Sequence, residues 1–142
     1  MKGATLDQQN ETKSYSKDSI IRFEEGLIGF AECKHFVLME NDQIAPLRMF
    51  QSAGSEIVSF LVLDAKMRIP GYYDDVPARE WESIGVTDPA KRLAFVIVNI
   101  GLNAKESTGN FQAPILINYE TMIGRQVILT DSGFCLRHPL IG

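Results

Sequence analysis

The chain has 142 residues, 45% of them hydrophobic and 23% charged, a size and composition typical of one globular domain that needs neither disulfides nor metals to bury a core. Its formal net charge of −4 argues against a protein that binds nucleic acid directly by neutralising phosphates. No apolar run approaches the roughly 20 residues of a membrane helix, and the N-terminus lacks the apolar core of a signal peptide, so we expect a cytoplasmic protein with no membrane partner.

The N-terminal segment, residues 1–18, is polar and shows little periodicity. It is expected to be a loose tail, with room for a short edge strand near Tyr15. Residues 19–142 are then expected to form a single domain.

Short β-like runs follow the tail and alternate with turn signals. The first turn is marked by Gly26 and Gly29, and a late one by Gly124, because glycine adopts backbone conformations that other residues avoid. The run 57–63 is apolar enough to be covered on both faces. The expected strands are residues 19–23, 36–40, 46–51, 57–63, 93–100, 113–119 and 125–130.

The pattern changes to helical in the middle of the chain. Asp74 or Asp75 can cap a helix, Pro77 suits its first turn, and Gly85 can end it. Residues 87–90 can open one further short turn. Few strong helical signals and many short strands predict a mostly β fold, a compact antiparallel β-barrel-like domain or sandwich with one or two short helices.

The sequence carries no recognisable catalytic or metal-binding motif. The GxSxG, GxxxxGK[ST] and GxGxxG patterns are all absent. Cys135 and His138 are three residues apart, so on an extended strand they point to opposite faces and do not form a nucleophile and base. Together with Cys33 and His35 they could supply four zinc ligands, but Cys-x-His is an unusual half-site. We therefore expect two reduced thiols, no metal, no other cofactor and no enzymatic activity.

Negative charge is concentrated between residues 74 and 88, where five acids accompany one base, Arg79. One interpretation is a solvated helix face; the other is a docking surface that attracts a basic partner. The acids are Asp74, Asp75, Glu80, Glu82 and Asp88.

The segment NFQAP, residues 110–114, places polar side chains and a proline directly before an apolar run. Pro114 has no N–H to donate and suits a sheet edge or the entry to a strand, while Asn110 and Gln112 can bond the backbone where the loop returns to the sheet. The alternative is that Asn110, Phe111 and Gln112 form a partner-binding rim.

Several unrelated motifs resemble the FliW family of flagellar assembly factors in order and spacing, from about Ile20 to Leu140. Ile28 departs from the family pattern, which commonly has proline inside GLxGF, and this change should loosen one turn. The motifs are IRFEEGLIGF (21–30), FVLME (36–40), MFQS (49–52), TGNFQAPILIN (108–118) and GRQVILTDSGFCLRHPL (124–140).

The resemblance implies a β-barrel-like binding protein that captures newly made flagellin. It also implies binding to the translational repressor CsrA, so that flagellin synthesis is coupled to flagellum assembly. An acidic surface has the right sign to approach an RNA-binding protein. Helix-forming flagellin ends would need exposed apolar contacts, for which the aromatic residues are candidates. The alternative for Trp81, on its short helix, is packing onto the barrel. The predicted partner-binding residues are Tyr72, Tyr73, Asp74, Asp75, Glu80, Trp81, Glu82, Asn110, Phe111 and Gln112.

A small-ligand-binding barrel is the main alternative. It would need an internal cavity, whereas large residues such as Phe60, Phe95 and Ile97 predict a filled interior.

Overall fold

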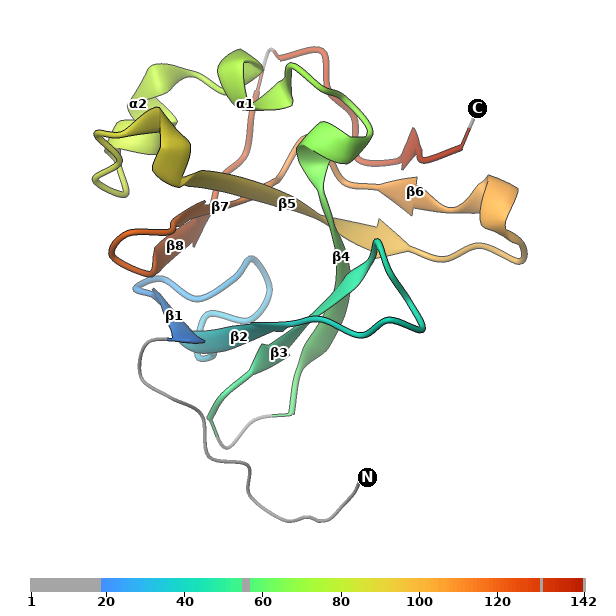
Figure 1. Ribbon diagram of the computed structural model, residues 1–142, viewed down its shortest axis with the longest axis horizontal. Coiled ribbons are helices and arrows are strands. Elements are labelled where there is room, and N and C mark those ends of the chain that lie inside the picture. Colours follow the sequence, from blue (N-terminus) through green and yellow to red (C-terminus); the bar gives the residue numbers. More distant parts are fainter. Residues whose placement is uncertain (1–18, 55–56, 131, 142) are drawn as a thin grey trace.

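The computed structural model describes residues 19–54, 57–130 and 132–141 (Figure 1). Within these residues seven strands close a barrel, in which every neighbouring pair is antiparallel except β1 and β8. The mostly β, barrel-like prediction is confirmed. The expected tail and the strand near Tyr15 lie outside the described residues. The barrel strands are β1 (Ile20–Phe23), β2 (His35–Met39), β3 (Arg48–Ser52), β4 (Ser59–Asp64), β5 (Arg92–Asn99), β7 (Ile115–Asn118) and β8 (Ile123–Gln126).

The last part of β5 leaves the barrel and starts a small additional sheet. It pairs with β6 (Thr108–Gly109), which pairs in turn with β9 (His138–Pro139). The Nε atom of Arg68 donates to the Pro139 carbonyl over 3.0 Å. Because proline lacks an N–H and its carbonyl is bonded, β9 offers little to a further strand.

Short helices lie between β4 and β5 and cover one side of the barrel, at the top of Figure 1. We call α1 (Tyr72–Asp75), α2 (Ala78–Glu82) and the 3-10 turn η3 (Pro89–Lys91) the helical cap. Two further 3-10 turns are η2 (Ala65–Met67) and η4 (Ala104–Glu106).

The helix boundaries differ from the prediction. Asp74 and Asp75 are not caps, because they lie inside α1, which follows Gly71 without a side-chain cap. Pro77 is the N-cap of α2 and not part of its first turn. Gly85 follows α2 with a φ of 76°, which agrees with its expected role as a helix end.

The central strands separate two apolar cores, and this explains why their sequences do not alternate. On β5, Ala94 and Val96 pack against the helical cap, whereas Phe95 packs inside the barrel. On β7, Leu116 belongs to the cap core and its neighbours Ile115 and Ile117 to the interior. A strand buried on both faces needs apolar residues at every position.

Phenylalanine rings fill the barrel interior. Phe36 and Phe50 stack with their centroids 4.8 Å apart, and Phe23 meets each of them edge-on at 5.6 Å. Together with Phe95, all four are almost fully buried. Of the three residues from which a filled interior was predicted, Phe95 lies in this core, and Phe60 and Ile97 are partly buried against it.

Several strand boundaries differ from the prediction, among them those of the runs 46–51 and 113–119, which become regular strand only at Arg48 and Ile115. The run 57–63 is not covered throughout, because Ile57 is 94% exposed and β4 begins only at Ser59. The run 125–130 is regular strand only to Gln126. Beyond it the N–H groups of Val127 and Leu129 still bond backbone carbonyls of the 112–114 segment, so the chain stays attached to the sheet without a regular ladder.

The turn at residues 27–30 has a bond that explains how Ile28 is accommodated. Its N–H donates to the Oε1 atom of Gln126 over 2.9 Å, and a proline at this position would lack that donor. Gly26 and Gly29 have φ values of 67° and 86°, as expected for the predicted turn.

Gly124 is part of β8, so its prediction as a turn was wrong. It lies opposite Phe23 and Ile117, and the real turn precedes it, where Met122 has a φ of 59°. A Cβ atom on Gly124 would lie 2.5 Å from Cζ of Phe23. Glycine is required here because the phenyl ring packs directly on the backbone.

We expect Gly124→Ala to lower the free energy of unfolding by about 1–3 kcal/mol, the usual cost of overpacking a core. Urea denaturation measures the change, and Phe23→Leu introduced with Gly124→Ala should recover part of the overpacking cost. Gly71→Ala is the control, because nothing lies within 4 Å of the added methyl group. A Gly124→Ala variant as stable as the parent would show that the ring moves without cost.

Candidate functional site

The helical cap contains most of the residues predicted to bind partners. Its short helices have four and five residues, too few to be stable alone in water. They are held by aromatic side chains that pack on the outer face of β5 and β7.

The four aromatic candidates for exposed contacts are all buried, which for Trp81 was the stated alternative. Tyr72 and Phe111 are fully buried, and Trp81 and Tyr73 are 4% and 9% exposed. The reason is the packing requirement of the short helices, because removing these rings from the sheet would leave the cap without a core. Their proposed role in binding is thus limited to supporting the surface above them.

The polar ends of these aromatic residues are all satisfied. The Tyr72 hydroxyl donates to the Phe111 carbonyl over 2.6 Å, the Tyr73 hydroxyl to Oδ1 of Asp64 over 2.7 Å, and Nε1 of Trp81 to the Tyr73 carbonyl over 3.1 Å. Burial raises the pKa of both tyrosine phenols well above its ordinary value. The two tyrosines are therefore neutral structural donors.

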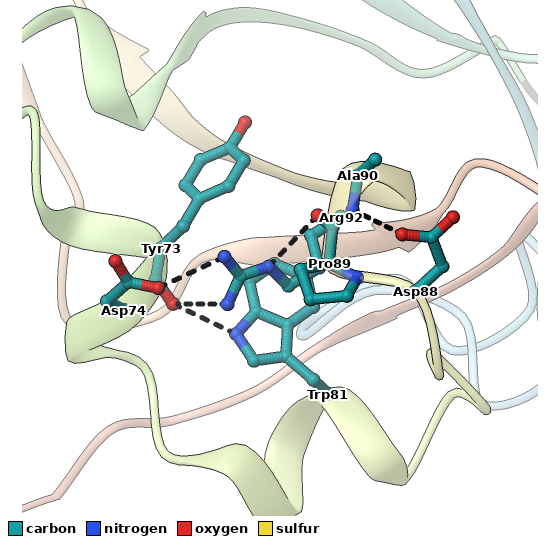
Figure 2. A network of polar contacts seen from close by, with 7 residues as sticks. All are labelled: Tyr73, Asp74, Trp81, Asp88, Pro89, Ala90 and Arg92. Atoms are coloured by element: carbon teal, nitrogen blue, oxygen red, sulfur yellow. Dashed lines mark hydrogen bonds and ion pairs between the residues drawn. The ribbon is translucent and has the colours of Figure 1, made fainter.

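Arg92, the first residue of β5, holds the cap to the barrel (Figure 2). Its guanidinium donates to Oδ1 of Asp74 over 3.0 Å and to the carbonyls of Tyr73 and Pro89 over 3.5 and 3.2 Å. It also lies 5.5 Å from the ring centroid of Trp81, within the range of a cation–π contact. The role of Arg92 was not foreseen, because in the sequence it follows the acidic segment and resembles an ordinary strand start.

The acidic residues have different local partners. The side chain of Asp74 is 82% exposed but paired with Arg92, and Glu80 lies 3.7 Å from Arg79. Asp88 bonds the N–H of Ala90 over 2.9 Å and begins η3. We call the set Asp74, Asp75, Glu80, Glu82 and Asp88 the acidic face.

Asp75 and Glu82 are the two members of the acidic face whose side chains have neither an ion pair nor a hydrogen bond in the described residues. Both are exposed. A solvated helix face and a docking surface share these properties, so the geometry is compatible with both interpretations.

The NFQAP segment is built into the architecture. Oδ1 of Asn110 accepts from the N–H of Ala113 over 3.0 Å, and Phe111 is buried against Tyr72. Gln112 takes part through its main-chain carbonyl, which accepts from the N–H of Leu129 over 2.7 Å, and not through its side chain as expected. Pro114 directly precedes β7, which lies between β5 and β8. Of the two uses foreseen for the proline, the structure shows strand entry and not a sheet edge.

A hollow lies at the end of the barrel where β1 and β8 meet. These strands pair at only two positions, Arg22 with Ile123 and Phe23 with Gly124. Beside this short pairing lies an open cavity of about 890 Å³, lined by apolar and charged residues including Leu93, Ile117, Arg22, Arg48 and Glu120. Within the described barrel, this cavity is where a small ligand could be accommodated.

Neither cysteine is part of a metal centre in the described residues. Cys33 is buried, Cys135 is exposed, and both are free thiols. No group of three or more potential ligands gathers among the residues that the structure describes. In the same part of the chain, no helix has the length and apolar character needed to cross a membrane.

Comparison with known proteins gives a consistent result over nearly the whole chain. The family model described as FliW protein matches residues 6–140. A flagellar assembly factor FliW from Caldanaerobacter subterraneus subsp. tengcongensis is 32% identical over 128 residues, which span 89% of this chain and 85% of the relative. One from Leptospira interrogans is 33% identical over 127 residues, with 89% and 85% covered. A crystal structure of the flagellar assembly factor FliW superposes with a TM-score of 0.82 at 30% identity, covering 92% of this chain and 91% of the other.

Proposed function

The chain belongs to the FliW family of flagellar assembly factors, and from that premise we propose that it binds flagellin and the translational repressor CsrA. In this proposal it works in the cytoplasm without catalysis. It captures newly made flagellin, and it relieves repression by CsrA when flagellin has been exported. Flagellin and CsrA then compete for the protein, which couples flagellin synthesis to flagellum assembly.

The observation that carries the CsrA part is the acidic face of the helical cap. Two of its carboxylates, those of Asp75 and Glu82, are exposed and unpaired in the described residues. A protein that binds anionic RNA needs basic residues, and a surface of opposite sign favours both encounter and correct orientation.

We expect simultaneous reversal of Asp74, Asp75, Glu80 and Glu82 to lysine to weaken CsrA binding about tenfold or more at low salt. The difference should shrink as salt is added, because exposed charges are screened. Calorimetry with purified CsrA at two ionic strengths measures both effects.

The control reverses four exposed acids outside the helical cap, in the segments that follow β1 and β2: Glu24, Glu32, Glu40 and Asp42. Both variants change the net charge by the same amount. A difference in their affinity for CsrA would therefore show a local role of the acidic face. Unchanged affinity in a folded cap variant would remove this face from CsrA binding.

Flagellin requires a different kind of surface. The aromatic residues first considered for it are buried, but several large apolar side chains beside β6 and β9 are exposed, among them Leu102 at 97% and Leu136 at 59%. Apolar residues of this kind suit an amphipathic helix. Calorimetry with purified flagellin, alone and in the presence of CsrA, tests the binding and the competition; binding of neither partner would overturn the proposal.

The open cavity at the barrel end favours small-ligand binding as the second candidate function. Its walls combine apolar residues with Arg22 and Arg48, a composition suited to a small amphipathic ligand. A native mass spectrum of the freshly purified protein tests for a retained molecule.

A further inference from the structure

A small hollow lies within the acidic face, between the two helices of the cap and η3. Its volume is about 230 Å³, enough for one side chain and too small for a helix or a strand. Its walls combine apolar side chains with polar ones in nearly equal measure, the polar ones including two carboxylates and one guanidinium. It is lined by Asp74, Val76, Ala78, Trp81, Glu82, Val86, Thr87, Pro89 and Arg92.

Of the two carboxylates that line the hollow, one has a counter-ion and the other does not. Asp74 is neutralised by the guanidinium of Arg92, 3.0 Å away. The exposed carboxylate of Glu82 has no ion pair or hydrogen bond within residues 19–54, 57–130 and 132–141. The hollow therefore combines an apolar floor with one available negative charge.

Arg92 shows how this environment holds a cation. Its guanidinium lies over the ring of Trp81 while Asp74 balances its charge. A second long basic side chain would find the same elements on the open side, namely an apolar wall for its methylene groups and the Glu82 carboxylate for its charge.

We propose that this hollow is an anchor pocket for a single lysine or arginine side chain of the basic partner. The aliphatic part of that side chain lies on Trp81 and Val86, and its charged end pairs with Glu82. The inference rests on the proposed function and adds to it, because it replaces general attraction by the acidic face with one defined contact. Charge complementarity favours a basic occupant over an apolar one.

Two matched pairs of variants test the anchor with purified CsrA. Glu82→Gln and Asp75→Asn each remove one exposed charge from the same face, but only Glu82 lines the pocket. Ala78→Leu and Ala90→Leu make the same change at exposed positions of the cap, and only Ala78 lines the pocket.

We expect Glu82→Gln and Ala78→Leu each to weaken binding about tenfold, and Asp75→Asn and Ala90→Leu to change it less than about twofold. Ala78→Leu is decisive because it fills the pocket without altering charge, and leucine is well tolerated in a helix. Equal effects within each pair would overturn the anchor while leaving the proposed function intact.

A probe that does not depend on CsrA separates the two proposals. The chain has one tryptophan, so the fluorescence of Trp81 reports directly on the pocket. Butylguanidinium should change this emission in the parent protein and not in Ala78→Leu, and 1-pentanol, its uncharged counterpart, should have much less effect.

Each outcome of the titration is informative. A response to butylguanidinium without any CsrA binding would support the pocket and overturn the proposed partner. An equal response to 1-pentanol would show a general apolar pocket and overturn the basic occupant. Binding of CsrA with no response to butylguanidinium in the parent protein would also overturn the anchor.

Discussion

Replacing Phe111 by alanine is expected to lower the free energy of unfolding by about 3–5 kcal/mol, the range for removing a buried aromatic ring. Phe111 is fully buried. Its ring centroid lies 5.4 Å from that of Tyr72 and 5.0 Å from that of His138. The residue therefore joins the helical cap to β9, and its loss leaves a cavity between them.

Thermal and urea denaturation measure this loss, which for a chain of this length corresponds to a melting temperature lower by about 10 °C. Gln112→Ala is the control at the next position, where the side chain is half-buried and makes no hydrogen bond within the described residues; it should cost less than about 1 kcal/mol. A stable Phe111→Ala variant that no longer binds flagellin or CsrA would instead support the partner-binding rim.

The sequence was sufficient for the features that depend on local chemistry. Gly26, Gly29 and Gly85 have positive φ values, as their positions at turns and a helix end suggested. The apolar runs became strands because few other arrangements bury residues on both faces of so short a segment. The mostly β architecture follows from these local signals.

Features that depend on contacts with distant parts of the chain could not be predicted from the sequence. The parallel pairing of Arg22 with Ile123 joins segments about a hundred residues apart and has no local signature. Gly124 was assigned to a turn because its actual reason, the ring of Phe23, is supplied by a distant strand. A glycine in an apolar stretch can indicate either a turn or close packing.

The candidate site shows the same division. The concentration of acids was visible in the sequence, but their pairing was not, because the counter-ion of Asp74 is Arg92 on β5. The burial of Tyr72 and Tyr73 was missed because tyrosine is common both in interfaces and in cores. Only the sheet beneath the cap decides between these uses.

Asn118 is a further residue whose role became clear only in the structure. It is 1% exposed, and its Nδ2 atom donates to the Ile84 carbonyl over 3.0 Å. Its Oδ1 atom accepts from the N–H groups of Glu120 and Thr121 over 2.9 and 3.2 Å. One side chain thus bonds the segment directly after α2 and the turn between β7 and β8.

We expect Asn118→Ala to lower the free energy of unfolding by about 2–4 kcal/mol, because it removes three hydrogen bonds and leaves the buried Ile84 carbonyl without its side-chain partner. Asn103→Ala is the matched control. Asn103 also bonds a backbone N–H two residues ahead, over 3.0 Å, but at an exposed site, and its loss should cost about 1 kcal/mol or less.

Whether the cap and the sheet of Asn118→Ala unfold together or separately is as informative as the size of the stability loss. If Asn118 joins the cap to the barrel, Trp81 fluorescence in Asn118→Ala should report release of the cap at a lower urea concentration than circular dichroism reports loss of the sheet. In the parent and in Asn103→Ala the two transitions should coincide, as in two-state unfolding. Coincident transitions in all three proteins would show that packing of the aromatic residues alone keeps the cap on the barrel.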